Sequence, residues 1–324
     1  MTPIGPFKPA WWLGNAHAQT IYPVFARRLT APIDIKERFE LPDGDFIDLS
    51  WAVNGLNSET PLVVLLHGLG GDVASPNVAG LLQSFNRRGW RGVFMHFRGA
   101  SHESNRLPRA YHSGFTGDLD CLLQALAVRE PHTKKAIVGV SLGGNVLLKW
   151  LGEQGSQSLV QAATAVSVPF DLQRVTERVK KGFSRVYQAY FLRCLRQIFE
   201  RKREQHGDLL PPATKDMELL RCFLAFDEQI IAPLYGYPNA HAYYREASSR
   251  QYLGSIKTPT LIIHALDDPM MTPEAIPQDE ELSEAITFEL SRKGGHVGFI
   301  EGNVPGKPIY WLDQRISDFL QAYL

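Results

Sequence analysis

Cysteine is scarce in this chain of 324 residues. The three cysteines, Cys121, Cys194 and Cys222, are far apart and form no CxxC pair. Neither a zinc knuckle nor a thioredoxin-like redox site is therefore indicated. An odd and widely spaced set of cysteines favours a reducing compartment, so we expect a cytoplasmic location.

Long hydrophobic runs are also missing. The densest apolar runs, such as residues 62–66, fall far short of the ~20 residues that span a bilayer. The first ten residues, MTPIGPFKPA, place prolines where a signal peptide needs an apolar stretch. We therefore expect a soluble chain without an integral membrane segment.

A net charge of either sign is absent, because 34 Lys and Arg balance 34 Asp and Glu. Nucleic-acid binding needs a clustered excess of basic residues to neutralise phosphates, so this balance argues against a nucleic-acid partner. Hydrophobic residues make up 44% of the chain and charged residues 21%, which excludes a disordered chain or a fibre. The oligomeric state stays open.

What the chain does contain is a regular alternation of strand-like and helical segments. Two β-like runs flank the turn Pro42-Asp43-Gly44-Asp45 and predict a hairpin. Wholly apolar runs such as residues 62–66 suit strands buried on both faces of a parallel sheet. The alternation predicts βαβ units and a mostly parallel sheet flanked by helices. We expect strands at 36–41, 46–53, 62–66, 92–97, 136–140, 162–168, 260–265 and 286–290, and helices from Pro76 (with Ser75 as N-cap) and at 117–129, 142–153 and 309–323.

The alternation breaks over residues 171–255, which are rich in helical patterns. We interpret this segment as an insertion folded over one end of the sheet as a lid, rather than as a loosely packed appendage. Its aromatic residues favour packing, since that many exposed rings would form a sticky patch. Ten Lys and Arg between Arg174 and Arg203 predict a solvated helix face. The aromatic residues on which this interpretation rests, all in the first part of the segment, are Phe183, Tyr187, Tyr190, Phe191 and Phe199.

The motif that carries chemistry is Gly139-Val140-Ser141-Leu142-Gly143, between a predicted strand and a predicted helix. This G-x-S-x-G pattern in strand–turn–helix context is a nucleophile elbow. The glycines relieve the clash that Cβ atoms would cause in such a tight turn. The turn would hold the Ser141 hydroxyl at the carboxyl end of the sheet, next to a helix N-terminus that favours negative charge.

A serine nucleophile needs a base, and four histidines follow Ser141 in the chain. His264 lies within a predicted strand, and His206 and His241 fall within the predicted lid. His296 lies in Gly294-Gly295-His296-Val297-Gly298, a loop between the last predicted strand and the closing helix. We therefore predict His296 as the base.

The base in turn needs an orienting acid, which follows the preceding strand in this order of residues. Asp267 and Asp268 are both available in the sequence Leu266-Asp267-Asp268-Pro269. The usual spacing after such a strand favours Asp268, while Asp267 could instead cap the turn. Asp267 remains the alternative.

An oxyanion hole completes the predicted site. One donor is the backbone N–H of Leu142, directly after the nucleophile, and the second comes from a loop after an early strand. That loop is His67-Gly68-Leu69-Gly70-Gly71, with the N–H of Leu69 as the donor. We expect His67 to stabilise this loop rather than to take part in catalysis.

A short stretch with His96, His102 and His112 makes a metal site conceivable. No cluster of histidines and carboxylates has a recognisable ligand spacing, so we expect no metal and no cofactor. Arg98-Gly99 more simply ends a strand and structures a loop near the active site.

Taken in order, these motifs resemble the bacterial YheT-like α/β hydrolases, which are related to eukaryotic α/β-hydrolase-domain lipases and yeast medium-chain ester synthases. The resemblance covers nearly the whole chain, and it implies an α/β-hydrolase fold with a helical lid and Ser141, Asp268 and His296 as the triad. Ala100 and His102 depart from similar sequences, which tend to have Cys and Gly there. The motifs are HGLGG, MHFRGASHESNRLPRAYHSGFTGD, GVSLGGN, HALDDPM and GGHVGF, with NAHAQT at 15–20 and KGFSR at 181–185.

Ser141 precedes the predicted lid, whereas Asp268 and His296 follow it. The expected organisation is therefore one catalytic domain, residues 1–170 and 256–324 with an N-terminal extension over about 1–35, and a lid over 171–255. We expect a serine carboxylesterase acting through an acyl-enzyme on small to medium-chain esters. The alternatives are an acyltransferase that makes esters, an amidase or peptidase, and a non-catalytic carrier of acyl ligands.

Overall fold

An eight-stranded sheet forms the centre of the computed structural model, which describes residues 7–324. The strand order is β1-β2-β4-β3-β5-β6-β7-β8. β2 pairs antiparallel with β1 and β4, and the other neighbours are parallel, so the prediction of a mostly parallel sheet is confirmed. The strands are β1 (Ile35–Glu40), β2 (Phe46–Ala52), β3 (Leu62–Leu66), β4 (Arg91–Met95), β5 (Lys135–Val140), β6 (Ala162–Val166), β7 (Thr260–Ala265) and β8 (Ile286–Ser291).

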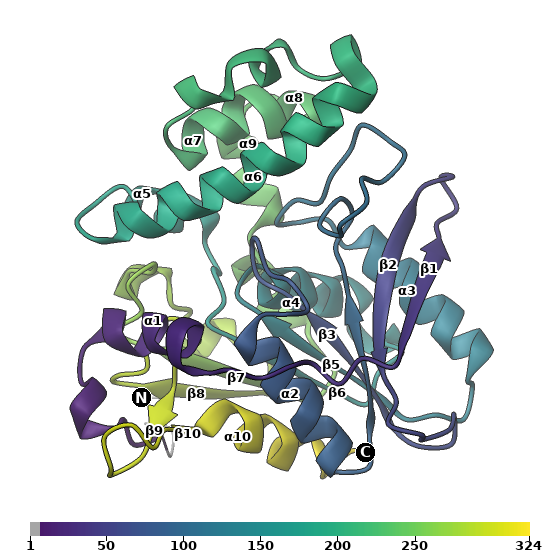
Figure 1. Cartoon of the computed structure of the whole chain (residues 1–324), viewed down its shortest axis with the longest axis vertical. Helices are drawn as coiled ribbons and strands as arrows, with labels where there is room; N and C mark the ends of the chain where they lie inside the picture. Colours follow the sequence, from purple (N-terminus) through teal and green to yellow (C-terminus); the bar gives the residue numbers. More distant parts are fainter. Residues whose placement is uncertain (1–6) are drawn as a thin grey trace.

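The central strands are apolar throughout because both of their faces are covered. In β3, Leu62, Val64 and Leu66 belong to one hydrophobic cluster. Val63 and Leu65 point to the opposite face and belong to another. The first cluster includes α3 (Gly117–Arg129) and α4 (Leu142–Gln154), and the second includes α2 (Pro76–Arg87) and α10 (Trp311–Leu320). The sheet is thus sandwiched between two helical layers (Figure 1).

Most predicted elements have their expected bounds to within two residues, and Ser75 and Pro76 begin α2 as predicted. The closing helix is an exception, because it starts two residues later than predicted and ends at Leu320, three residues before the predicted end. Ile309–Tyr310 forms β10, which pairs antiparallel with β9 (Ile300–Glu301), so its backbone is extended and α10 begins only at Trp311.

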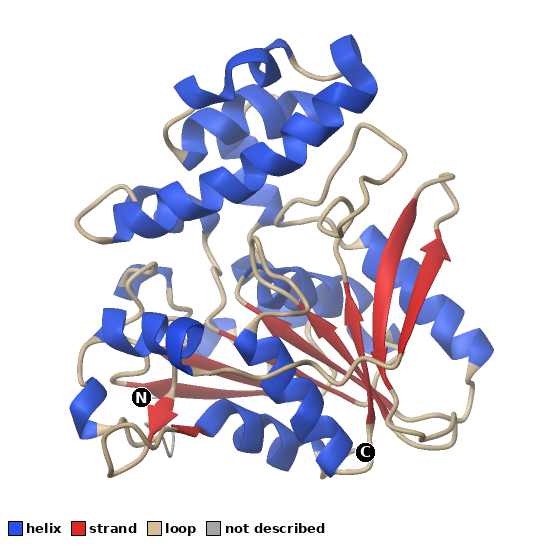
Figure 2. Ribbon diagram, viewed as in Figure 1, coloured by secondary structure: helices blue, strands red, loops and turns tan. Residues whose placement is uncertain are grey.

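A helical insertion lies between β6 and β7, and Figure 2 shows it stacked above the sheet. The longest helix of this insertion is α6. One segment connects the insertion to the end of β6, and another connects it to the start of β7. We call it the lid. Its helices are α5 (Leu172–Arg178), α6 (Ser184–His206), α7 (Phe223–Phe226), the π-helix η5 (Asp227–Ile231), α8 (Ala232–Tyr235) and α9 (Ala240–Ala247), with 3₁₀ turns η3 (Gly207–Leu209), η4 (Pro212–Leu219) and η6 (Arg250–Ser255).

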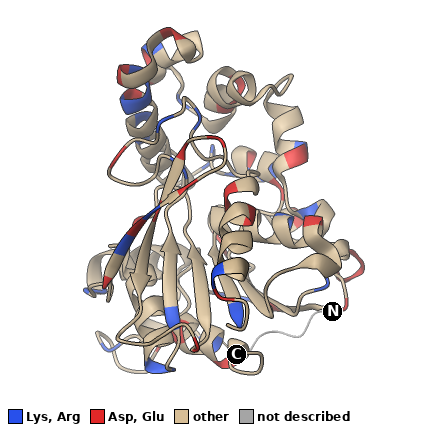
Figure 3. Ribbon diagram, turned by 90° about the vertical axis from the view of Figure 1, so that its right-hand side faces the viewer, with Lys and Arg blue, Asp and Glu red and all other residues tan. Residues whose placement is uncertain are grey.

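Two expectations about the lid side chains need correction. Phe199 is fully buried, but Phe183 and Tyr190 are 50% and 57% exposed, so not every aromatic residue packs inward. Lys and Arg recur along the lid helices (Figure 3). Lys202 is nevertheless fully buried rather than solvated, because its Nζ donates to the carbonyls of Asn105 and Leu107.

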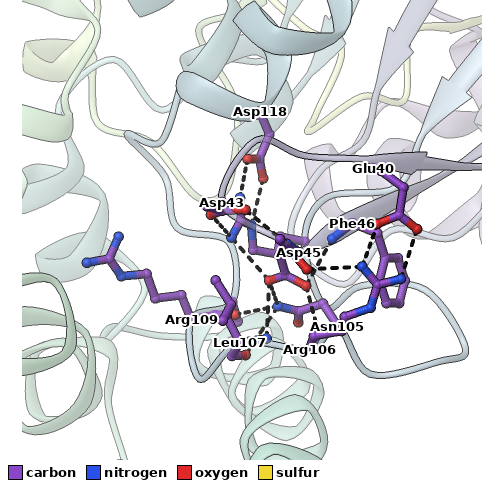
Figure 4. A network of polar contacts seen from close by, with 12 residues as sticks. Glu40, Asp43, Asp45, Phe46, Asn105, Arg106, Leu107, Arg109 and Asp118 are labelled. Atoms are coloured by element: carbon purple, nitrogen blue, oxygen red, sulfur yellow. Dashed lines mark hydrogen bonds and ion pairs between the residues drawn. The ribbon is translucent and has the colours of Figure 1, made fainter.

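A buried ionic network holds the loop between β4 and α3. The Arg98 guanidinium donates to Asp118 at 2.6 Å and 3.1 Å, and to Asp43 and Asp45 at 2.7 Å and 3.1 Å. Figure 4 shows Asp43, Asp45 and Asp118 converging at this point, beside Asn105. The network joins the hairpin turn to α3 and to the loop that contacts the lid, as the interpretation of Arg98 as a loop-structuring residue predicts.

The N-terminal segment contains η1 (Trp11–Leu13) and α1 (Ala16–Ala26). Asn15 caps α1 by accepting from the backbone N–H of His17. No helix within residues 7–324 is both long enough and apolar enough to cross a membrane.

Candidate active site

Ser141 occupies a strained turn between β5 and α4. Its φ of 53° and ψ of −119° lie in a region that residues with a side chain rarely adopt. The backbone N–H of Ser141 donates to the carbonyl of Val166 at 2.8 Å, which pins the turn to β6. A Cβ at Gly139 would lie 2.5 Å from the Gly143 carbonyl oxygen, and one at Gly143 would lie 2.6 Å from that of Leu66. Both glycines of the motif are therefore required by close backbone approach.

The structure brings three predicted side chains into one hydrogen-bonded chain. His296 Nε2 is 2.9 Å from Ser141 Oγ, and His296 Nδ1 is 2.7 Å from Asp268 Oδ2. Because the Asp268 carboxylate can only accept, the imidazole proton lies on Nδ1 and Nε2 accepts from the serine hydroxyl. Asp268 and His296 are 3% and 8% exposed, so the chain is largely shielded from water.

Asp267 has a different position from its neighbour. Its Oδ1 accepts from the backbone N–H of Gly295 at 2.9 Å, so it braces the loop that carries His296. Burial raises the pKa of the Asp267 carboxyl. The Asp268 carboxylate, by contrast, also accepts from the backbone N–H of Met270 at 2.9 Å, which fixes its orientation toward the imidazole.

Helix α1 supports the same loop, a role that sequence reasoning missed. The Thr20 hydroxyl accepts from the backbone N–H of His296 at 2.9 Å, and Gln19 exchanges hydrogen bonds with the backbone of Ile300. A Cβ at Gly295 would lie 2.5 Å from the Ala16 carbonyl oxygen, so the helix and the loop are in direct contact. The motif at 15–20 was visible in the sequence, but nothing there indicated that it faces residues 294–300.

The predicted oxyanion loop lies directly against the serine. A Cβ at Gly68 would be 3.1 Å from Ser141 Cβ, and Leu69 and Leu142 both line the adjoining pocket. Within residues 7–324 no hydrogen-bond acceptor pairs with the backbone N–H of Leu69 or Leu142. The two amides are therefore available to an oxygen bound next to Ser141.

His67 has the structure of a loop-stabilising residue. Its Nδ1 donates to the Gly68 carbonyl at 2.7 Å, and its Nε2 accepts from the backbone N–H of Phe97 at 3.1 Å. Burial lowers the pKa of His67 to about 4, so the ring is neutral.

The other histidines do not join the serine. His264 is buried in β7, and His206 and His241 lie in lid helices. His96 Nε2 contacts the Ser50 hydroxyl at 2.9 Å. Across the described residues no group of three or more His, Cys, Asp or Glu side chains is arranged to hold a metal ion.

An apolar pocket opens between Ser141 and the lid. It encloses about 830 Å³, including its open mouth. Its lid wall includes Val175, Val179, Phe191, Leu195 and Phe223. A mostly apolar lining with a few polar groups is the character of a site for a small organic molecule. The pocket also contains one carboxyl group that sequence reasoning did not single out, that of Asp227.

Comparison with known proteins shows the family to which the chain belongs. Residues 61–303 match the family model described as the alpha/beta hydrolase fold. The chain is 43% identical over 98% of its length to the Escherichia coli protein named "Putative esterase YheT", of which it covers 94%. The chain belongs to the YheT-like group of the α/β-hydrolase family.

More distant similarities extend over most of this YheT-like chain. A Mus musculus protein named "Phospholipase ABHD3" is 28% identical over 98% of the chain, with 78% of that protein covered. Among solved structures, an esterase of Pyrococcus furiosus superposes with a TM-score of 0.58 over 90% of this chain and 91% of that one. Its sequence identity is 16%, so it shows the shared fold alone.

Proposed function

We propose that this YheT-like protein is a serine carboxylesterase that hydrolyses small to medium-chain esters through an acyl-enzyme. The observation that carries the proposal is the chain of hydrogen bonds from Ser141 through His296 to Asp268 at the base of an apolar pocket. The names of the relatives, esterase and phospholipase, support hydrolysis of ester bonds.

In the proposed reaction His296 Nε2 takes the hydroxyl proton as Ser141 Oγ attacks the ester carbonyl carbon. Asp268 holds the imidazole through Nδ1 and stabilises the imidazolium that forms. The amides of Leu69 and Leu142 bind the oxyanion, and loss of one such donor costs about 3 kcal/mol in a transition state. His296 then protonates the leaving alcohol, and a water molecule activated by the same imidazole releases the acid.

The same proposal assigns the domains. Residues 1–170 and 256–324 form one catalytic domain, and residues 171–255 form its lid. The lid supplies apolar side chains such as Val175 and Leu195 to the pocket, which suits a neutral acyl chain. No bound cofactor has a part in the proposed reaction.

The decisive test is the substitution Ser141→Ala, assayed on p-nitrophenyl esters of increasing acyl length. We expect loss of turnover by about 10⁶-fold, down to the rate that binding and the oxyanion amides provide alone. A fluorophosphonate probe should label the wild-type serine and not the variant. Unchanged turnover in the variant would refute the proposal.

Product analysis with added alcohol distinguishes hydrolysis from acyl transfer. Hydrolysis gives the free acid, whereas transfer gives a new ester. A carrier that only binds acyl groups would give neither product and would not react with the probe.

A further inference from the structure

One carboxyl group, Asp227, faces the pocket without a place in the proposed triad. It is the first residue of the π-helix η5, and Ile231 at the end of the same turn also lines the pocket. π-turns are rare and occur frequently at functional positions, since the inserted residue worsens the helical hydrogen bonding. The widened turn thus places both of its end residues on the pocket wall.

The surroundings of Asp227 provide little compensation for a charge. The Tyr244 hydroxyl, from α9, donates to Asp227 Oδ2 at 2.6 Å. No Lys or Arg belongs to the described residues that line the pocket. Burial raises the pKa of Asp227 to about 7. Near neutral pH the carboxyl group is therefore protonated in a large fraction of molecules and offers both a hydrogen-bond donor and an acceptor.

A half-buried acid with so little compensation for its charge destabilises a fold, because an apolar residue of the same size would fill the position without a desolvation penalty. Residues kept at a cost to stability commonly serve a function. The neighbouring Glu228 offers a contrast, since it is exposed, does not line the pocket and accepts from the backbone N–H of Ala240 at 2.6 Å. Glu228 has a structural partner outside the pocket, whereas Asp227 faces the pocket itself.

The polar groups near Asp227 also suit a neutral ligand. Tyr243 contacts both Tyr244 and His112 through its ring, at centroid distances of 5.4 Å. Burial lowers the pKa of His112 to about 3, and its Nδ1 accepts from the backbone N–H of Gly114, so the neutral ring bears its proton on Nε2. This part of the pocket therefore combines donors and acceptors with no fixed charge.

We propose that Asp227, oriented by the Tyr244 hydroxyl, forms a polar subsite that binds a hydroxyl group of the substrate ester. The subsite rests on the proposed esterase function, and it assigns hydroxylated esters as the preferred substrate class. A carboxylate or phosphate would meet repulsion whenever Asp227 is ionised, and an ammonium group would require the carboxyl to be ionised, whereas a hydroxyl group can pair with either form. The hydroxyl can belong to the alcohol or to the acyl chain of the ester.

The test compares kcat/KM within two matched pairs of esters, using the whole purified protein. The first pair is 1-octanoylglycerol and propyl octanoate, which differ in hydroxyls on the alcohol. The second pair is p-nitrophenyl ω-hydroxyoctanoate and p-nitrophenyl octanoate, which differ in a hydroxyl on the acyl chain. The quantity measured is the ratio of kcat/KM for the hydroxylated ester to that for the plain ester.

Asp227→Leu, which keeps the size and removes the hydrogen bond, should lower this ratio by about tenfold or more in at least one pair. Tyr244→Phe should lower the ratio in the same pair. Glu228→Gln, on the same turn, is the matched control and should leave the ratio unchanged. The pair that responds identifies the part of the ester that bears the hydroxyl.

Asp227→Asn separates a hydroxyl from a cation as the ligand, because the amide keeps hydrogen bonding and cannot become charged. With a hydroxyl as the ligand, the ratio in this variant should stay within about threefold of wild type. The inference is overturned if Asp227→Asn lowers the ratio as much as Asp227→Leu does. It is also overturned if neither Asp227→Leu nor Tyr244→Phe changes the ratio. If Ser141 still reacts with fluorophosphonate, only the subsite fails; if it does not react, the esterase function fails as well.

Discussion

Asp267 and Asp268 are adjacent carboxylates whose roles differ because their side chains point to different partners. Asp268 contacts the imidazole of His296, and Asp267 contacts the backbone of Gly295 in the same loop. The strand that ends at Ala265 and the turn after it decide which carboxylate faces the histidine. Sequence spacing favours Asp268, and the direction of the two side chains provides the geometric reason.

This pair allows a matched test at the level of single residues. Asp268→Asn should reduce kcat by about 10⁴-fold, because an amide that donates to Nδ1 stabilises the wrong imidazole tautomer. Asp267→Asn should have a much smaller effect, since its amide oxygen can still accept from Gly295 N–H. Steady-state kinetics on one p-nitrophenyl ester measures both. Equal losses in the two variants would contradict the assignment of Asp268.

At the level of elements, α6 shows how a charged residue anchors the lid. Lys202 is fully buried and donates to two carbonyls of the loop between β4 and α3. Burial lowers the pKa of Lys202 to about 8. The sequence predicts that the basic residues of this helix face water, which is wrong for Lys202. Its position in the sequence does not distinguish a lysine that donates to buried carbonyls from one that faces solvent.

Lys202→Met tests this anchor, since methionine retains the apolar stem and cannot donate. We expect the free energy of unfolding to fall by about 1–3 kcal/mol, the cost of leaving buried carbonyls without a partner. Arg203→Met is the matched control on the next residue, where the side chain is exposed and donates only to the Lys215 carbonyl. Urea denaturation measures both variants, and equal stability would show that the Lys202 contacts contribute little.

At the level of the whole molecule, the candidate site is assembled from segments far apart in the chain. Ser141 precedes the lid, His296 follows it, and Thr20 joins them from α1. The pocket is then closed by lid residues such as Asp227. The half-buried acid in the lid is therefore part of the candidate site, and its partial desolvation should affect unfolding of the protein.

The raised pKa of Asp227 predicts how the free energy of unfolding depends on pH. Its pKa is raised from 3.8 to about 7 by burial, so between these values the folded protein binds more protons than the unfolded chain. The contribution of this group to the free energy of unfolding is complete below pH 4 and is lost as pH rises through about 7. The loss amounts to at most about 4 kcal/mol. Relative to Asp227→Asn, the wild-type free energy of unfolding should fall over this range. Parallel curves for the two proteins would contradict the raised pKa.

Local patterns were sufficient to predict the tight turn at Ser141, the loop that carries His296 and the parallel sheet, because each depends on residues close together in the chain. Gly139 and Gly143 restrict the turn around Ser141, and apolar strands such as β3 require cover on both faces. The contact of Thr20 with the histidine loop, the inward direction of Lys202 and the exposure of Asp227 to the pocket depend on how distant elements pack. No short-range pattern encodes those contacts, since chain folding alone brings their partners together.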